Sequence, residues 1–263
     1  MKDAAIATSG FIAPDWSAPA CVRAYVTTRL APGVSRPPFD RCNLGDHVGD
    51  DASAVQRNRG LLSAALNLPT EPLWLRQVHG TQVCDADRLI AAADRSAIVA
   101  DAALTRRPAQ VLAVMTADCL PLLLCADDGS EVAALHAGWR GLAAGIIETT
   151  VARMHTPPKR LLVWLGPAIG PRAFEVGADV RDIFVHENAA AKAAFSRIAS
   201  AGSAAKCLCD LYQLARLRLD RLAVAEVSGG GYCTFSDPEH FFSHRRDRSS
   251  GRMASLIWIE PAL

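Results

Sequence analysis

The sequence predicts an α+β (mixed α/β) fold in a single domain. Segments with strand-like and helix-like patterns follow one another without the strict strand–helix–strand order of a doubly wound fold. At about 150 residues per domain, a chain of 263 residues fits one large domain or two small ones. No internal repeat and no Gly/Ser/Pro-rich linker divides the chain, so we expect one domain over residues 1–263.

The first predicted elements are a helix and a hairpin. Asp50 and Asp51 precede apolar residues at helical spacing, and a helix should therefore run from this cap to about Asn67. The pattern then predicts a hairpin, with strands at Leu73–Val78 and Thr81–Cys84 and a tight turn at His79-Gly80.

A second hairpin follows a buried strand predicted at Val111–Met115. Its strands are expected at Leu120–Cys125 and Glu131–Leu135, joined by the turn sequence Asp127-Asp128-Gly129-Ser130. If this loop is symmetric, Pro121 faces His136 across the pair. Cys119 then lies at the same open end, within about two residues of His136.

The remainder of the chain continues the mixture of helices and strands. Apolar runs bounded by Gly or Pro indicate strands, and apolar residues at helical spacing after a capping residue indicate helices. We expect, in order, a helix at Leu142–Met154, a strand at Leu161–Leu165, a mainly helical stretch at Glu175–Phe195, a helix capped by Asp210, a strand at Val224–Val227, a turn at Gly229–Gly231 and a strand at Met253–Ile259.

Composition excludes several classes of protein. Lys and Arg total 28 against 27 Asp and Glu, and this balance is unlike that of a nucleic-acid-binding protein. The longest apolar segment, Val111–Ala126, is interrupted by Asp118 and Pro121 and is too short for a membrane helix. The start Met1-Lys2-Asp3 lacks the features of a secretory signal. We therefore expect the eight cysteines to be reduced thiols in a soluble cytoplasmic protein.

The second hairpin brings a thiol and an imidazole together by local structure. Such a pair can bind a transition metal or form a nucleophile–base couple. A zinc site with one open position needs a third protein ligand, and His79, which lies 40 residues before Cys119, is the candidate. The spacing alone is also compatible with a buried cysteine and two surface histidines.

A cluster of arginines near the C-terminus permits two interpretations. Arg245, Arg246, Arg248 and Arg252 fall within eight residues, not far from a Gly-rich turn. They predict either a solvated face or a site for a small anion. Cys207 and Cys209 form a Cys-x-Cys pair without a second pair, so they do not predict a standard zinc knuckle.

Several motifs together resemble the YfiH-like, or laccase-domain, family. The resemblance spans roughly Val22 to the C-terminus, and the order of RQVHG, ADCLP and HAGWRG is highly specific. Two positions depart from the usual pattern, Ser250 in place of Thr and His244 in place of an aromatic residue. The matching segments are Asn43-Leu44-Gly45, His47–Asp51, Arg76–Gly80, Ala117–Pro121, His136–Gly141, Gly166–Pro171, Cys233-Thr234, Phe241–Ser243 and Arg245–Asp247.

The resemblance implies both an architecture and an activity. The family fold is a single domain of packed mixed β-sheets with outer helices, and the matching His79, Cys119 and His136 would bind one zinc and form the catalytic centre. The implied activity is phosphorolysis of the purine nucleosides adenosine, inosine, guanosine and methylthioadenosine, together with adenosine deamination. The expected partners are accordingly a small nucleoside and phosphate, and neither nucleic acid nor a membrane.

Phosphorolysis needs phosphate held beneath C1′ of the ribose. Guanidinium groups hold phosphate through paired hydrogen bonds, and the first candidates are Arg140 and Arg246, followed by Arg59 and Arg76. The amides of Asn43 and Gln77 are candidates for contacts with sugar hydroxyls or base edges.

Three alternatives are set against the phosphorylase hypothesis. A copper-dependent polyphenol oxidase, or laccase, is disfavoured because a multicopper site needs many imidazoles, and the seven histidines include no His-x-His pair. A single copper ion could still replace zinc at one His/Cys/His group. The others are a hydrolytic editing factor for peptidoglycan precursors and a non-enzymatic metal-stabilised binding module, for which four protein ligands would be expected.

Overall fold

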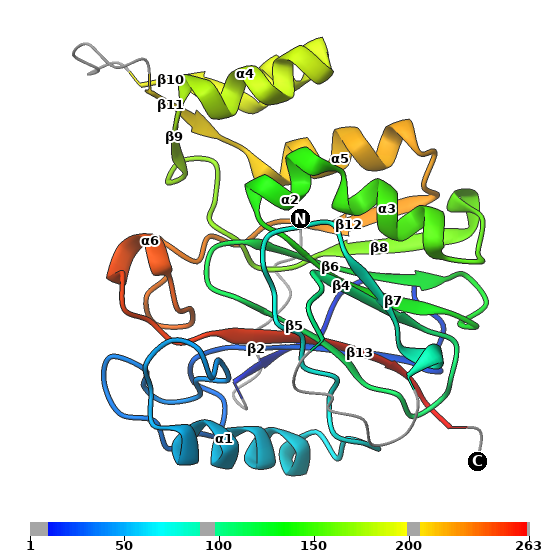
Figure 1. The fold of residues 1–263 in the computed structure, drawn as a ribbon, viewed down its shortest axis with the longest axis vertical. Helices are drawn as coiled ribbons and strands as arrows, with labels where there is room; N and C mark the ends of the chain where they lie inside the picture. The colour runs from blue at the N-terminus through cyan, green and yellow to red at the C-terminus, as the bar shows by residue number, and fades with distance from the viewer. Residues whose placement is uncertain (1–9, 90–97, 199–205, 262–263) are drawn as a thin grey trace.

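Two β-sheets pack face to face between layers of helices in the computed structural model, which describes residues 10–89, 98–198 and 206–261 (Figure 1). One sheet has four strands in the order β1-β2-β13-β5, and every neighbouring pair in it is antiparallel. Its strands are β1 (Phe11–Ile12), β2 (Val22–Thr27), β13 (Met253–Ile259) and β5 (Leu112–Thr116).

The second sheet has six strands in the order β12-β8-β6-β7-β4-β3. The two outermost pairs, β12 with β8 and β3 with β4, are parallel, and the inner pairs are antiparallel, so this sheet is mixed. Its strands are β12 (Glu226–Gly229), β8 (Leu161–Leu165), β6 (Leu120–Ala126), β7 (Val132–Ala137), β4 (Ala102–Thr105) and β3 (Val83–Asp85). The predicted mixed α/β fold of packed sheets is confirmed.

Helices cover the outer face of each sheet (Figure 1). The four-stranded sheet is covered by α1 (Ala52–Ala65), and the six-stranded sheet by α2 (Trp139–Ala144), α3 (Ile146–Arg153) and α5 (Leu211–Arg221). A three-stranded sheet of β9 (Glu175–Gly177), β10 (Phe195–Arg197) and β11 (Lys206–Cys209) lies beyond α5 together with α4 (Ala178–Glu187). The other short helices among the described residues are α6 (His244–Asp247), η1 (Ala86–Arg88), η3 (Pro158–Arg160) and η4 (Ala189–Ala194).

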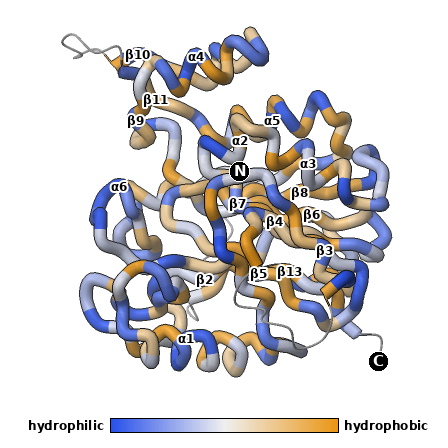
Figure 2. The backbone as a smooth tube through the Cα atoms, viewed as in Figure 1, coloured by the Kyte–Doolittle hydropathy of each residue, from blue (hydrophilic) through white to orange (hydrophobic). Residues whose placement is uncertain are grey.

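The core strands are apolar on both faces because each sheet has a packed layer on either side. In β6, Leu122 and Leu124 pack toward the helices, whereas Leu123 and Cys125 pack toward the four-stranded sheet. A strand buried on both faces appears in a sequence as an uninterrupted apolar run, as β6 does. The central strands are accordingly coloured mainly as hydrophobic in Figure 2, whereas α1 alternates between hydrophilic and hydrophobic residues.

Several predicted elements are confirmed. The carboxylate of Asp51 accepts hydrogen bonds from the backbone N–H groups of Ser53 and Ala54 and caps α1. The strands β8 and β13 have the predicted bounds. The β6–β7 hairpin has the predicted register, with Pro121 opposite His136.

The predicted hairpin around His79-Gly80 is wrong. Leu73 instead forms a bridge with Leu112, and Arg76 forms one with Val99. The segment after the turn enters β3, which pairs in parallel with β4. The turn itself is held by a side chain from elsewhere in the chain, which removes the need for direct pairing of its two arms.

Three other expectations need correction. The helix predicted at Leu142–Met154 begins earlier and is divided into α2 and α3, because Gly145 has a φ of 93° that no helix interior permits. The stretch predicted to be helical from Glu175 begins with a strand, β9. The strand predicted at Val224–Val227 lies two residues later, since Val224 still donates to the carbonyl of Leu219 beyond the end of α5.

The composition-based expectations are tested only for the described part of the chain. No helix there is both long enough and apolar enough to cross a membrane. The apolar segment Val111–Ala126 forms β5 and β6 instead. All eight cysteines are free thiols, as expected. The N-terminal residues Met1–Asp3, used for the expectation about a secretory signal, lie outside the described residues.

Candidate metal centre

Cys119 and His136 lie at the open end of the β6–β7 hairpin. Cys119 occupies the tight connection between β5 and β6, directly after Asp118, whose φ is 91°. His136 lies in β7, opposite Pro121, and is almost fully buried. Hairpin register alone therefore places the thiol near the imidazole, as the sequence predicts.

The third predicted side chain, that of His79, meets the other two. Nitrogen and sulfur atoms of His79, Cys119 and His136 all lie within 4.8 Å of one another. The Sγ of Cys119 is 3.6 Å from Nε2 of His79. The two imidazole rings meet edge to face, with their centroids 4.7 Å apart. The two imidazoles differ in exposure, because His79 is exposed to solvent and His136 is buried.

The spacing of these atoms fits a tetrahedral metal ion. Zinc–nitrogen and zinc–sulfur bonds of about 2.1 and 2.3 Å at the tetrahedral angle separate the two ligand atoms by about 3.6 Å. This value equals the distance between Nε2 of His79 and Sγ of Cys119. The neighbouring Gly138 leaves room for the group, because a Cβ there would lie 2.7 Å from Cδ2 of His79 and 3.0 Å from Sγ of Cys119.

A buried carboxylate that we did not identify from the sequence, that of Asp101, organises two of the three side chains. Its Oδ1 lies 2.8 Å from Nδ1 of His136. The same oxygen accepts a hydrogen bond from the backbone N–H of His79, and Oδ2 accepts from the N–H groups of Val78 and Gly80. A carboxylate on the far ring nitrogen fixes the orientation and tautomer of a metal-binding histidine.

The electrostatics of the group are those of a thiolate beside an imidazolium when no metal is bound. Burial opposes ionisation of Cys119, but the charge of His136 and hydrogen bonds from both imidazoles outweigh it and lower the pKa of the thiol. Burial also opposes the charge on His136, whereas the Cys119 thiolate and Asp101 raise its pKa. A divalent cation would replace the proton of the imidazole and compensate the same two negative charges.

Asp118 fixes the backbone of the cysteine turn. Its Oδ1 accepts a hydrogen bond from the Thr234 hydroxyl at 2.6 Å, and its Oδ2 accepts from the backbone N–H of Arg245, also at 2.6 Å. Its carbonyl accepts from the N–H of Ile169. These bonds tie three distant segments to the residue before Cys119, which holds this non-glycine residue at its positive φ.

A small, mostly apolar cavity of about 130 Å³ opens beside Cys119. Aromatic and aliphatic side chains form its walls, and His244 and Arg245 from α6 contribute its polar groups. Pockets of this kind, apolar with a few placed polar groups, are typical of small-molecule sites. The residues that line it are Ala117, Asp118, Cys119, Trp139, Ile169, Phe174, Leu211, His244 and Arg245.

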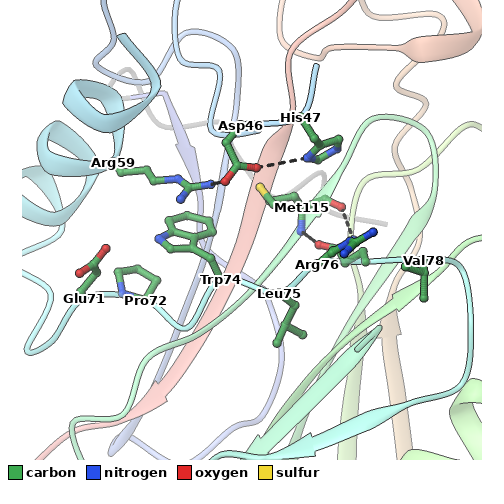
Figure 3. Close-up of a pocket in the computed structure, with 11 residues that line it drawn as sticks. Asp46, His47, Arg59, Glu71, Pro72, Trp74, Leu75, Arg76, Val78 and Met115 are labelled. Atoms are coloured by element: carbon green, nitrogen blue, oxygen red, sulfur yellow. Dashed lines mark hydrogen bonds and ion pairs between the residues drawn. The ribbon is translucent and has the colours of Figure 1, made fainter. Parts of the chain in front are cut away.

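A larger cavity of about 720 Å³ adjoins the segment that leads to His79 (Figure 3). Three residues predicted to bind substrate line it together, namely Arg59, Arg76 and Gln77. Arg59 packs its guanidinium 4.3 Å from the ring centroid of Trp74 and forms an ion pair with Asp46. Gln77 is clamped to the backbone N–H and carbonyl of one residue, Met115.

The other predicted substrate contacts lie in different settings. Asn43 is fully buried, and both ends of its amide are hydrogen bonded within the protein. All five N–H groups of the Arg246 guanidinium already have acceptors, so phosphate binding there would require these bonds to break. Arg140 is exposed and lies over the ring of Trp139, 4.4 Å from its centroid, at the start of α2.

A model of the family described as multi-copper polyphenol oxidoreductase laccase matches residues 23–260. The chain belongs to this family. Its relatives include "Purine nucleoside phosphorylase PA4543" of Pseudomonas aeruginosa, which is 51% identical over 96% of this chain and 99% of the relative. Another, "Purine nucleoside phosphorylase YfiH" of Escherichia coli, is 50% identical over 95% of this chain and 99% of the relative.

Solved structures of family members have the same fold. The Neisseria meningitidis protein NMB0706 has a TM-score of 0.88 and 46% identity, covering 96% of this chain and 100% of that one. The Bacillus licheniformis hypothetical protein YfiH has a TM-score of 0.85 and 28% identity, covering 97% and 98%. The resemblance to YfiH-like, laccase-domain proteins is therefore confirmed along nearly the whole chain.

Proposed function

We propose that the protein is a zinc-dependent purine nucleoside phosphorylase whose metal ligands are His79, Cys119 and His136. One observation carries the proposal, namely that three ligand atoms lie within 4.8 Å of one another and that one of the three residues, Cys119, lines a small apolar cavity. The names of relatives at about half identity support the same reaction class. Three protein ligands leave a coordination position open, as catalytic zinc sites do, whereas a purely structural site would use four.

The donor set favours zinc over a multicopper centre. Among the described residues, one group of side chains lies close enough together to hold a metal ion, and it consists of two histidines and one cysteine. One nitrogen–sulfur–nitrogen group is suited to zinc and can bind one copper ion, but it cannot supply the several imidazoles of a multicopper oxidase. The oxidase named in the family description therefore has no counterpart in this arrangement.

The proposed reaction exchanges one bond at the anomeric carbon. The C1′–N9 bond breaks and its electron pair goes to the purine, while an oxygen of phosphate forms the new bond to C1′. The products are ribose 1-phosphate and, after a proton is taken up, the free base. His79, Cys119 and His136 would hold a divalent ion, which would supply Lewis acidity to this reaction and an activated water for adenosine deamination.

The cavity beside Cys119 is the proposed site of the purine base. Trp139 and Phe174 offer aromatic surfaces for stacking, and Leu211 completes an apolar wall. His244 and Arg245 provide polar groups for the edge of the base. Such a pocket recognises the common shape of purines more strongly than their substituents, in keeping with adenosine, inosine, guanosine and methylthioadenosine as substrates.

The remaining predicted residues have indirect or outer positions in this proposal. Arg140 and Arg76 keep exposed side chains through which they could attract phosphate. Gln77 and Arg59 shape the segment before His79 from the larger cavity. Asn43 supports a neighbouring turn from the interior.

Purified protein incubated with inosine provides the test. Ribose 1-phosphate should appear only when phosphate is present, and Cys119→Ala should abolish turnover while thermal unfolding stays cooperative. Metal analysis after purification without added metal should give about one zinc per chain. Full activity of the Cys119→Ala variant, or turnover that is independent of phosphate, would contradict the proposal.

A further inference from the structure

The side chain of Arg252 is held firmly in place just before β13. Its backbone N–H donates to Oδ1 of Asn43 at 2.9 Å, and its Nη1 donates to the carbonyls of Ser250 and Gly251. The neighbouring Gly45 accommodates it, since a Cβ there would lie 2.7 Å from Cγ of Arg252. The surrounding turns therefore fix the direction of this guanidinium.

Arg252 has no carboxylate partner, unlike two other arginines of low exposure in the described part of the chain. Arg218 forms ion pairs with Glu148 and Glu187, and Arg106 forms ion pairs with three acidic side chains. Arg252 is half-buried, yet no acidic group in the described ranges lies within ion-pair distance of it. Its Nε and Nη2 also have no acceptor among the described residues, and these atoms carry three N–H groups.

Strand pairing places Arg252 close to the metal centre. Met253, the first residue of β13, faces Thr116, the last residue of β5, so Arg252 lies next to the turn that carries Asp118 and Cys119. Burial lowers the pKa of its guanidinium, while the charges of Cys119 and Asp118 raise it. Both oxygens of Asp118 are already occupied, by the Thr234 hydroxyl and the backbone of Arg245. Cys119 is directed to the two imidazoles. Arg252 is thus near the metal ligands but bonded to none of them.

We propose that Arg252 binds the phosphate oxyanion that reacts at the metal centre. A half-buried guanidinium without a counterion is costly, and a bound anion removes that cost. Its Nε and Nη2 remain available to an anion, and arginine is suited to a tetrahedral oxyanion because its N–H groups form a planar fork. This assignment rests on the proposed phosphorylase function and replaces Arg246, whose donors are all in use, as the main phosphate contact.

Direct binding of phosphate to the zinc-loaded protein tests the assignment without relying on turnover. Isothermal titration with inorganic phosphate should give at least tenfold weaker binding for Arg252→Gln than for the unmodified protein. Arg252→Lys should lose less, since it keeps the charge but not the fork. The matched control is Arg248→Gln, which removes an exposed arginine of the same segment and should bind as the unmodified protein does. Zinc content should be equal in all four proteins.

Turnover separates this inference from the proposed function. With inosine, Arg252→Gln should raise the KM for phosphate at least tenfold and leave the KM for inosine within about twofold. A phosphorylase whose Arg252→Gln and Arg252→Lys variants bind phosphate normally would overturn the role of Arg252 alone. A protein without phosphate-dependent turnover would overturn the function, while the titration would still decide whether Arg252 binds the anion.

A second titration identifies the source of the phosphate group. Inorganic phosphate and the 5′-phosphate of inosine monophosphate present similar oxygens to a guanidinium. We expect the binding of inorganic phosphate to depend on Arg252. Inorganic phosphate should compete for binding with neither inosine nor adenosine. Dependence on Arg252 for inosine monophosphate but not for inorganic phosphate would overturn the assignment to the attacking phosphate.

Discussion

The carboxylate of Asp101 lies 2.8 Å from Nδ1 of His136 and also accepts hydrogen bonds from the backbone of Val78, His79 and Gly80. One side chain therefore orients one imidazole through its ring and another through its turn. The turn needs this support, because His79 has a φ of 61° that non-glycine residues seldom adopt. Asp101 thus links two candidate ligands that are 57 residues apart in the sequence.

Replacing Asp101 by Asn should weaken metal binding while leaving the three candidate ligands in place. An amide presents an NH₂ group toward backbone N–H donors and removes the charge that favours the correct imidazole tautomer. Loss of such outer partners typically lowers metal affinity about 10- to 100-fold. Competition with a chromophoric zinc chelator would measure the change.

The control for this variant is Asp220→Asn, which neutralises an exposed carboxylate on α5. It should bind zinc with unchanged affinity. Equal zinc affinities of Asp101→Asn and Asp220→Asn would show that Asp101 has no influence on the metal centre.

Gly138→Ala should also reduce zinc affinity, but for a steric reason. The added Cβ would lie 2.7 Å from Cδ2 of His79 and 3.0 Å from Sγ of Cys119, so these two side chains must separate. The matched control is Gly60→Ala in α1, where a Cβ meets no atom within 4 Å and should stabilise the helix by up to about 1 kcal/mol. Zinc binding and thermal unfolding of both variants test this contrast. Normal zinc affinity in Gly138→Ala would contradict it.

The sequence predicts the part of the candidate metal centre that local geometry sets. The turn sequence between β6 and β7 fixes the register, and the register alone places Cys119 near His136. His79 could be proposed as a third ligand, but not placed, because its approach depends on Asp101. A sign of that carboxylate was nevertheless present, since Asp101 interrupts an apolar run from Ile98 to Leu104.

The errors in the fold arose where tertiary contacts outweigh local pattern. The segments on either side of His79 have hairpin-like composition, yet they pair with Leu112, Val99 and β4 instead of each other. Side-chain pattern cannot distinguish these partners, because β pairing depends on which strands the rest of the fold makes available. The surroundings of Arg246 could not be foreseen for a similar reason, since the acceptors of its guanidinium are mostly backbone carbonyls that no motif reveals.

In the metal-free protein, Cys119 should be alkylated faster than the buried thiols. Its alkylation should also continue at lower pH than that of an ordinary thiol. Burial opposes its ionisation, but the neighbouring imidazoles lower its pKa, so its thiolate persists below the ordinary thiol pKa of about 8.5 and is lost only as the pH falls through the lowered value. Burial raises the pKa of both Cys42 and Cys125 to about 12. Mass spectrometry after iodoacetamide treatment at pH 7 should therefore find Cys119 modified well before these two.

The control for this experiment compares the effect of zinc on Cys119 with its effect on a second accessible thiol, that of Cys233. Burial opposes ionisation of Cys233, but hydrogen bonds, chiefly the one with Ser236, lower the pKa of this thiol. Cys233 lies outside the His/Cys/His group. Zinc loading should protect Cys119 and leave the labelling of Cys233 unchanged. Equal protection of both thiols, or none at Cys119, would argue against metal coordination by this sulfur.

Phe174→Leu tests the cavity beside Cys119 as the site of the purine. The smaller aliphatic side chain keeps the wall apolar but removes an aromatic surface, and such stacking contributes about 0.5–1.5 kcal/mol. The KM for inosine should therefore rise roughly 2- to 10-fold, with zinc content unchanged. Phe195→Leu is the matched control, because Phe195 packs against Phe184 away from this cavity and should leave the KM unaltered. A KM for inosine that responds equally to both substitutions would mean that the base binds elsewhere.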